Sequence, residues 1–166
     1  MSISKNDLKK FSSLKRKTNR KELGAFVVEG VKNCKELIKS RLQILTLLIT
    51  EENLLSDFPN GIIISENDAS RITQLKSHSS VIAIAKIPEN RISTKLDKPI
   101  LFLENIKDPG NLGTIIRTLD WFGYSQLFCS LNCVDAFNSK TVMASMGSVF
   151  RLNINYLNFL ELIEKF

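Results

Sequence analysis

The sequence is short of several residue types, and each shortage excludes a class of protein. The 166-residue chain has one histidine, His78, and three cysteines, Cys34, Cys129 and Cys133, which are too few and too widely spaced for a metal site or a disulfide framework. We therefore expect no metal and three buried, reduced thiols. No apolar run approaches the roughly 20 residues that a membrane span needs, and residues 1–14 are too polar for a signal peptide. These absences predict a cytoplasmic protein without a membrane partner.

The residues that are present are typical of a globular protein with a basic surface. Hydrophobic residues make up 43% of the chain and charged residues 24%, which allows one ordinary domain or two small ones. The net charge of +6 suits a polyanionic partner. Basic residues concentrate near the start of the chain: Lys5, Lys9, Lys10, Lys15, Arg16, Lys17, Arg20 and Lys21. Two interpretations stay open, a solvated helix face followed by a loose arm, or a surface that follows RNA phosphates.

Apolar periodicity in the first half of the chain predicts alternating helices and strands. Ser4 is placed to cap a helix with Leu8, Phe11 and Leu14 on its apolar face. Strands are expected at residues 25–28, 44–49, 62–64 and 81–87, and helices at 31–40, 51–55 and 66–74. This alternation predicts a parallel or mixed sheet with helices on both faces. Residues 89–99 are polar and aperiodic, which predicts a linker between a domain of residues 1–88 and one of residues 100–166.

Residues 100–123 form the most informative stretch of the chain. An apolar run predicts a buried strand at residues 100–103, and Asp108 followed by Pro109 predicts the start of a helix. Five apolar residues recur at helical spacing and Gly123 ends the helix; they are Leu112, Ile115, Ile116, Leu119 and Phe122. A second arc of the same helix carries Asn111, Thr114, Arg117, Thr118 and Trp121. A polar arc that follows a strand-to-helix turn lies where α/β folds commonly bind ligands.

The remaining residues continue the alternating pattern. A strand is expected at residues 126–129, and Ser139 is placed to cap a helix that runs from Lys140 to Met146. Residues 149–154 are strand-like. Residues 157–166 predict a helix that buries Leu157, Leu160, Ile163 and Phe166.

Two motifs resemble a known family. Asn105, the run from Asp108 to Gly113, Arg117-Thr118 and Phe122-Gly123 resemble the first motif of the SpoU/TrmH family, in the SPOUT superfamily. Members of that family methylate ribose 2′-hydroxyls of transfer or ribosomal RNA with S-adenosylmethionine. Residues 135–140, 144–148 and 150–152 resemble the segment that follows. Residues 14–17, Arg20 and residues 24–30 resemble the opening of an RNA substrate-binding domain similar to ribosomal protein L30e.

The resemblance implies a fold and a set of site residues. The fold class is α/β, with an L30e-like α/β/α domain followed by the first part of a SPOUT methyltransferase domain of the α/β knot type. In the family the arginine at the position of Arg117 activates the ribose hydroxyl, and the asparagine at the position of Asn111 positions the ribose or the arginine. A guanidinium suits an oxyanion because it presents several donors and keeps its charge. RNA contacts are expected at Arg16, Lys17, Arg20, Thr118 and Ser145.

The resemblance also implies what this sequence leaves out. The family's later motifs, which enclose the cofactor in a deep knot, are expected beyond Phe166, so no cofactor-binding residue is assigned here. We expect a fragment or truncated product that lacks a complete cofactor pocket, and a homodimer in the full-length form. The alternatives are a noncatalytic RNA-binding module and a small-molecule binding protein. The basic segment argues against the small-molecule binder.

Overall fold

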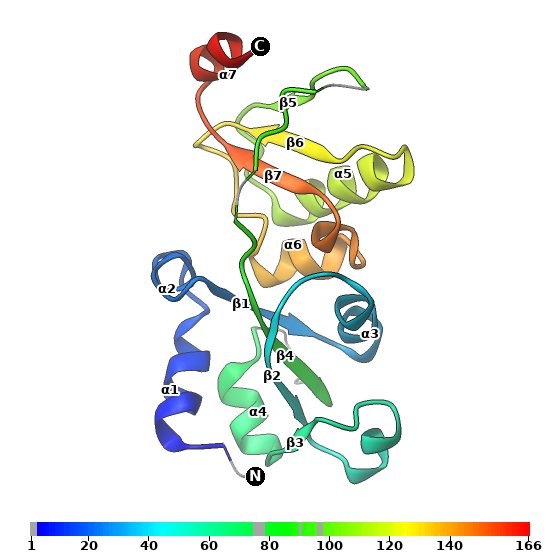
Figure 1. The fold of residues 1–166 in the computed structure, drawn as a ribbon. Helices are drawn as coiled ribbons and strands as arrows, with labels where there is room; N and C mark the ends of the chain where they lie inside the picture. Colours follow the sequence, from blue (N-terminus) through cyan, green and yellow to red (C-terminus); the bar gives the residue numbers. More distant parts are fainter. Residues whose placement is uncertain (1–2, 75–78, 90, 96–97) are drawn as a thin grey trace. The chain divides into compact units, whose positions relative to one another are not determined.

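A computed structural model describes residues 3–74, 79–89, 91–95 and 98–166. His78 and part of the expected linker, Asn90, Leu96 and Asp97, lie outside these residues. The chain divides into two compact units, residues 1–87 and 88–166, and each has its own sheet (Figure 1). Within the described residues, no helix is long and apolar enough to span a membrane. All three cysteines are buried, as predicted.

The first unit contains a mixed sheet. Its helices are α1 (Lys5–Ser13), α2 (Lys17–Leu23), α3 (Val31–Lys39) and α4 (Glu66–Ile72), with a 3-10 helix η1 (Glu52–Ser56). Its strands are β1 (Ala25–Glu29), β2 (Ile44–Ile49), β3 (Ile62–Ile63) and β4 (Val81–Lys86). They are ordered β1-β4-β2-β3, and only β2 and β3 pair in parallel. The prediction of a mixed sheet is confirmed.

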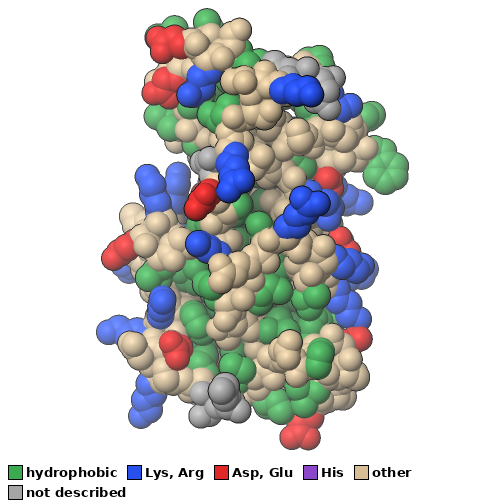
Figure 2. Space-filling view, in the orientation of Figure 1, with side chains coloured by type: hydrophobic (Ala, Val, Ile, Leu, Met, Phe, Trp, Pro, Cys, Tyr) green, Lys and Arg blue, Asp and Glu red, His purple; other side chains and the backbone are tan. Residues whose placement is uncertain are grey.

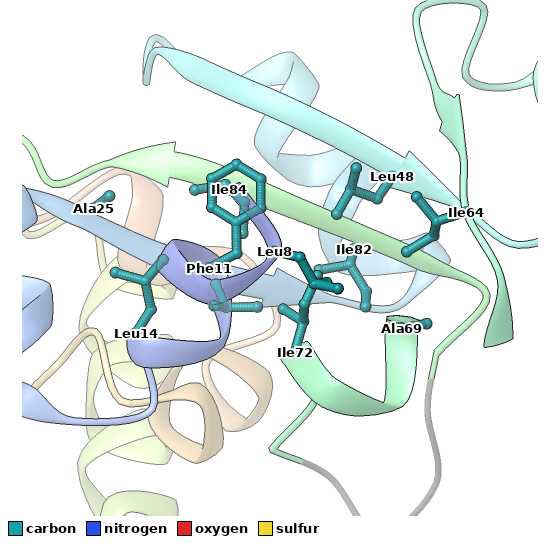
Figure 3. Close-up of a cluster of buried hydrophobic side chains, with 11 residues drawn as sticks. Leu8, Phe11, Leu14, Ala25, Leu48, Ile64, Ala69, Ile72, Ile82 and Ile84 are labelled. Atoms are coloured by element: carbon teal, nitrogen blue, oxygen red, sulfur yellow. The ribbon is translucent and has the colours of Figure 1, made fainter. Parts of the chain in front are cut away.

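Helices cover both faces of this sheet. On one face, α1 and α4 pack against the sheet through a buried cluster that includes Leu8, Phe11 and Ile72 (Figure 3). On the other face lies α3, which buries Cys34 and Leu37 and leaves Ile38 47% exposed. Because both faces are covered, every residue of β1 is buried.

Helix α2 lies where one of the two interpretations of the basic segment placed a loose arm. It ends at Gly24, whose backbone φ of 58° is the left-handed conformation common at helix C-termini. Arg20 on this helix is only 2% exposed, and its guanidinium donates to the backbone carbonyls of Leu14, at 2.8 Å, and Lys15, at 3.1 Å. Arg20 therefore holds α2 against the end of α1.

Glu29, at the end of β1, is a buried carboxylate. It is 3% exposed, and it accepts hydrogen bonds from the hydroxyl of Thr73 and, at 3.1 Å, from the backbone N–H of Gln74. Burial raises the pKa of Glu29, although these hydrogen bonds and the charge of Lys15 act in the opposite direction. Glu29 thus ties the end of β1 to the residues that follow α4.

The second unit contains a parallel sheet ordered β5-β6-β7. Its strands are β5 (Phe102–Leu103), β6 (Gln126–Cys129) and β7 (Asn153–Tyr156). Its helices are α5 (Pro109–Trp121), α6 (Ser139–Ala144) and α7 (Phe159–Lys165), with a 3-10 helix η2 (Ser148–Phe150). Helices α5 and α6 lie on one side of the sheet, and α7 packs on the other through contacts between Phe159 and Phe102 and between Phe166 and Phe128 (Figure 1).

Several predicted details of the second unit are wrong. Asn138 caps α6, and the predicted cap residue Ser139 is buried within the helix. The strand-like residues 149–154 divide between η2 and β7. Helix α7 begins after Asn158, which forms a capping box with Glu161. That start buries Leu162 and leaves Leu160, Ile163 and Phe166 exposed, although all three were predicted to be buried.

Gly113 permits close contact between α5 and α6. A Cβ atom at this position would lie 2.5 Å from the Cβ of Ala144 and 2.8 Å from the carbonyl oxygen of Thr141. Neither neighbour is a flexible side chain that could move aside. A glycine inside a helix costs about 1 kcal/mol relative to alanine, and here the close approach of α6 accounts for it.

We expect Gly113→Ala to lower the free energy of unfolding. Overpacking of a buried site costs about 1–3 kcal/mol, which outweighs the roughly 1 kcal/mol that alanine contributes to helix propensity. Urea denaturation followed by circular dichroism measures the change. Thr114→Ala, at the next, exposed position of the same helix, is the matched control and should leave stability nearly unchanged. A Gly113→Ala protein as stable as the control would contradict the close contact.

We expect the stability of the first unit to depend on the ionisation of Glu29. The pKa of Glu29 is higher in the folded than in the unfolded chain, so its contribution is fully present below the unfolded pKa of about 4.3 and is lost as pH rises through the folded pKa. The Glu29→Gln variant has no ionisable group at this position. The unfolding free energy of the wild type, measured relative to this variant, should therefore fall as the pH rises from about 4 to 7. A difference that rises over this range would refute the assignment. Glu22→Gln, at an exposed position, is the control.

Candidate active site

The site begins with the loop that joins β5 to α5. At its end, the Asp108 carboxylate accepts a hydrogen bond of 2.8 Å from the backbone N–H of Asn111 and caps the helix as predicted. Pro109 follows at the first helical position, where its missing N–H leaves no bond unmade. Leu112, Ile116 and Leu119 are buried, and they fix the rotation of α5. Phe122, predicted to extend this stripe, lies just past the last helical residue and is 64% exposed.

The connection between β6 and α6 holds this loop. The hydroxyl of Ser130 accepts from the backbone N–H of Asn105 at 3.0 Å, and Asn105 has a positive φ of 58°. The thiol of Cys133 accepts from the N–H of Ile106 at 3.3 Å and donates to the carbonyl of Leu103 at 3.3 Å. The sequence analysis did not identify Ser130 and Cys133 as support for the site, because their partners are backbone groups about 25 to 30 positions away.

One face of α5 carries the predicted polar arc. Asn111, Thr114, Arg117 and Thr118 are exposed, and Trp121 is 87% exposed. The Thr114 hydroxyl donates to the carbonyl of Gly110 and the Thr118 hydroxyl to that of Thr114, both at 3.0 Å. These hydroxyls therefore offer acceptor oxygens outward. Asn111 lies in the first turn and Arg117 about 9 Å further along the helix axis, from 1.5 Å per residue.

Arg117 makes no hydrogen bond or ion pair to any residue that the structure describes. The two acidic residues at the ends of α5, Asp108 and Asp120, are bound to other groups. Asp108 caps the helix, and Asp120 accepts hydrogen bonds of 2.9 and 2.6 Å from the guanidinium of Arg151. Burial acts to raise the pKa of Asp120, but the hydrogen bonds from Arg151 and Ser148 and the charge of Arg151 together lower it.

A depression of about 800 Å³ adjoins Arg117 on this unit. Its lining combines guanidinium, hydroxyl, indole and thioether groups, from Thr114, Arg117, Thr118, Asp120, Trp121, Met146, Ser148 and Arg151. Such a surface can hold an anionic ligand that also has an apolar face.

The predicted site residue Asn111 does not line this depression, and neither do two further predicted residues, Ser145 and Arg20. Ser145 is fully buried, and its hydroxyl donates to the carbonyl of Val142 at 2.8 Å. Arg20, in the first unit, is occupied by the backbone carbonyls described above. Their predicted contacts with RNA are therefore corrected: both side chains serve the fold. Arg16 and Lys17 are exposed at the start of α2, as a role in binding requires.

Exposed basic residues gather on α1 and α2. They are Lys5, Lys9, Lys10, Lys15, Arg16, Lys17 and Lys21, of which Lys15 and Arg16 lie between the two helices. Figure 2 shows Lys and Arg side chains along the part of the surface that these two helices form. The loose arm expected in one interpretation of the basic segment is wrong, since part of the segment is helix α2, and both a solvated helix face and an RNA-binding surface stay open.

Two family models together match nearly the whole chain. Residues 5–95 match the model described as the MRM3-like substrate binding domain, and residues 98–166 match that of the SpoU rRNA Methylase family. Among curated proteins, the chain is 29% identical over 162 residues to the 23S rRNA (guanosine(2553)-2'-O)-methyltransferase RlmP of Bacillus subtilis. That alignment covers 95% of this chain and 64% of RlmP.

Solved structures of similar sequence have the same fold. A putative RNA methyltransferase of the TrmH family from Porphyromonas gingivalis superposes with a TM-score of 0.83 at 29% identity, over 95% of this chain and 64% of that one. An AdoMet-bound rRNA methyltransferase from Sinorhizobium meliloti gives 0.81 at 28% identity, over 99% and 66%. The chain thus spans about two thirds of the length of these relatives, and the predicted fold class is confirmed.

We expect Ser130→Ala to loosen the loop before α5. Removing the hydroxyl leaves the N–H of the exposed Asn105 without its protein acceptor, at a net cost of about 0.5–1.5 kcal/mol. Amide hydrogen exchange should therefore speed up at Asn105, because the opening of this loop becomes easier. Ser125→Ala, at an exposed position of the same unit, should leave that exchange rate unchanged. Equal rates in the two variants would show that Ser130 does not anchor the loop.

Proposed function

Because the chain belongs to the family with an MRM3-like substrate-binding domain, here joined to a domain of the SpoU rRNA Methylase family, we propose that it takes part in methylating ribose 2′-hydroxyls of ribosomal RNA. Arg117 carries this proposal. It is a cation on the exposed face of α5, with no acidic partner in the described part of the chain, beside a depression wide enough for a nucleotide.

Arg117 acts on the ribose hydroxyl through its charge. Methyl transfer requires the hydroxyl oxygen to become a nucleophile, so negative charge develops on that oxygen as its proton leaves. A guanidinium is a poor base, because it stays protonated, but its donors stabilise the developing alkoxide and a neighbouring phosphate. Thr118 lies beside Arg117 and offers an acceptor oxygen to the sugar. Asn111, exposed in the first turn, positions the ribose.

The basic surface of the first unit supplies the contact with the rest of the RNA. Arg16 and Lys17 lie on it, and Arg20 fixes it by binding the carbonyls of Leu14 and Lys15. Contacts of this kind depend on phosphate charge, so the affinity should fall steeply with salt.

S-adenosylmethionine is the proposed methyl donor, since the Sinorhizobium meliloti relative is described as AdoMet-bound. This donor carries a sulfonium cation. The residues beside Arg117 do not suit this cation, because they present two guanidinium groups and their one carboxylate, Asp120, is bound by Arg151. We therefore assign these residues to the RNA and none of them to the donor. We further propose a homodimer in the cytoplasm as the working form.

The decisive variant is Arg117→Ala in the protein that carries this chain. Methyl incorporation into ribosomal RNA from radiolabelled S-adenosylmethionine should fall by about 10²–10³-fold, the usual cost of removing one donor to a developing oxyanion. RNA affinity across a salt series should change little, because the basic surface is intact. Arg117→Lys keeps the charge but not the fork of donors and should recover only part of the activity.

The competing function, a noncatalytic RNA-binding module, predicts a different result. Salt-sensitive RNA binding would persist, but the wild type would incorporate no methyl groups. Methyl incorporation that is equal in the wild type and in Arg117→Ala would refute the role of this arginine.

A further inference from the structure

We propose that Trp121 is the stacking platform for a nucleobase of the bound RNA, so that the depression on α5 holds a whole nucleotide. The inference rests on the proposed RNA substrate, and it assigns a base-binding subsite in addition to the ribose-binding group.

The position of Trp121 beside Arg117 carries the proposal. The two residues are four apart on α5, so their side chains are neighbours on one face, with Cβ atoms about 5–6 Å apart. Trp121 is 87% exposed, and both residues line the same depression, together with Thr118 and the partly exposed Met146. A nucleotide has an anionic or hydroxyl-bearing backbone attached to a flat aromatic base, which matches a cation next to an indole.

The charges of the depression favour RNA over a protein as the occupant. Its one carboxylate, Asp120, is bound by Arg151, and Arg117 has no partner among the described residues. The net charge of the chain is +6. A second copy of the chain seated on this surface would oppose arginines to arginines, whereas an RNA strand supplies the opposite charge and an aromatic face together.

The chain offers a direct test, because Trp121 is its only tryptophan. All indole fluorescence therefore reports on this one position. A short single-stranded RNA should quench the emission, since a stacked base contacts the indole directly. An abasic oligonucleotide of the same length and backbone should bind to the basic surface and leave the emission nearly unchanged.

Substitutions give an independent measure. Trp121→Ala should weaken binding of the single-stranded RNA by about 5- to 100-fold in fluorescence anisotropy with a labelled oligonucleotide, and should leave binding of the abasic strand unchanged. Trp121→Phe keeps an aromatic face and should retain most of the affinity. The matched control is Phe122→Ala, which removes the adjacent exposed ring that does not line the depression. This control should bind like the wild type.

Each other outcome overturns the proposal in a distinguishable way. RNA that binds with salt-dependent affinity but leaves the fluorescence unchanged would refute the base subsite and leave the RNA-binding function standing. The absence of RNA binding even at low salt would refute both. A blue shift of the emission with rising protein concentration, without RNA, would show that a second copy covers Trp121 and would refute the base subsite.

Discussion

The fixed rotation of α5 is the constraint on which the rest of the second unit depends. Leu112, Ile116 and Leu119 are buried on one side, and Gly113 brings the backbone of α6 within contact distance. Any turn of the helix about its axis would drive a side chain into α6 or expose the apolar stripe. The opposite face, with Arg117 and Trp121, is therefore held toward solvent by packing and not by polar contacts of its own.

The two units use polar anchors in the same way, although their sheets differ. In the first unit the carboxylate of Glu29 binds the residues that follow α4, and in the second unit Ser130 and Cys133 bind the loop before α5. In each case a buried side chain fixes a segment that has no regular structure. Such anchors are costly to leave unpaired, so they specify one conformation of the loop.

The start signals of helices could be predicted from the sequence, and the choice of buried face often could not. Ser4 and Asp108 cap helices as expected, because a cap depends on residues within one turn. The prediction of which side of α7 is buried was wrong. Apolar residues lie on more than one side of this short helix, so its packing against the rest of the unit decides which of them are buried. Arg20 and Ser145 belong to motifs expected at the RNA, but only the folded chain brings the backbone carbonyls that occupy them.

The isolation of Arg117 has a consequence for the lifetime of a complex. A guanidinium without a protein partner samples many rotamers, and ordering it when a ligand arrives costs up to about 2 kcal/mol of conformational entropy. That cost is subtracted from the affinity at every encounter. A side chain that an ion pair had already ordered would not bear this cost, and its ligand would dissociate more slowly. A mobile arginine therefore suits a site that must release a product chemically similar to its substrate.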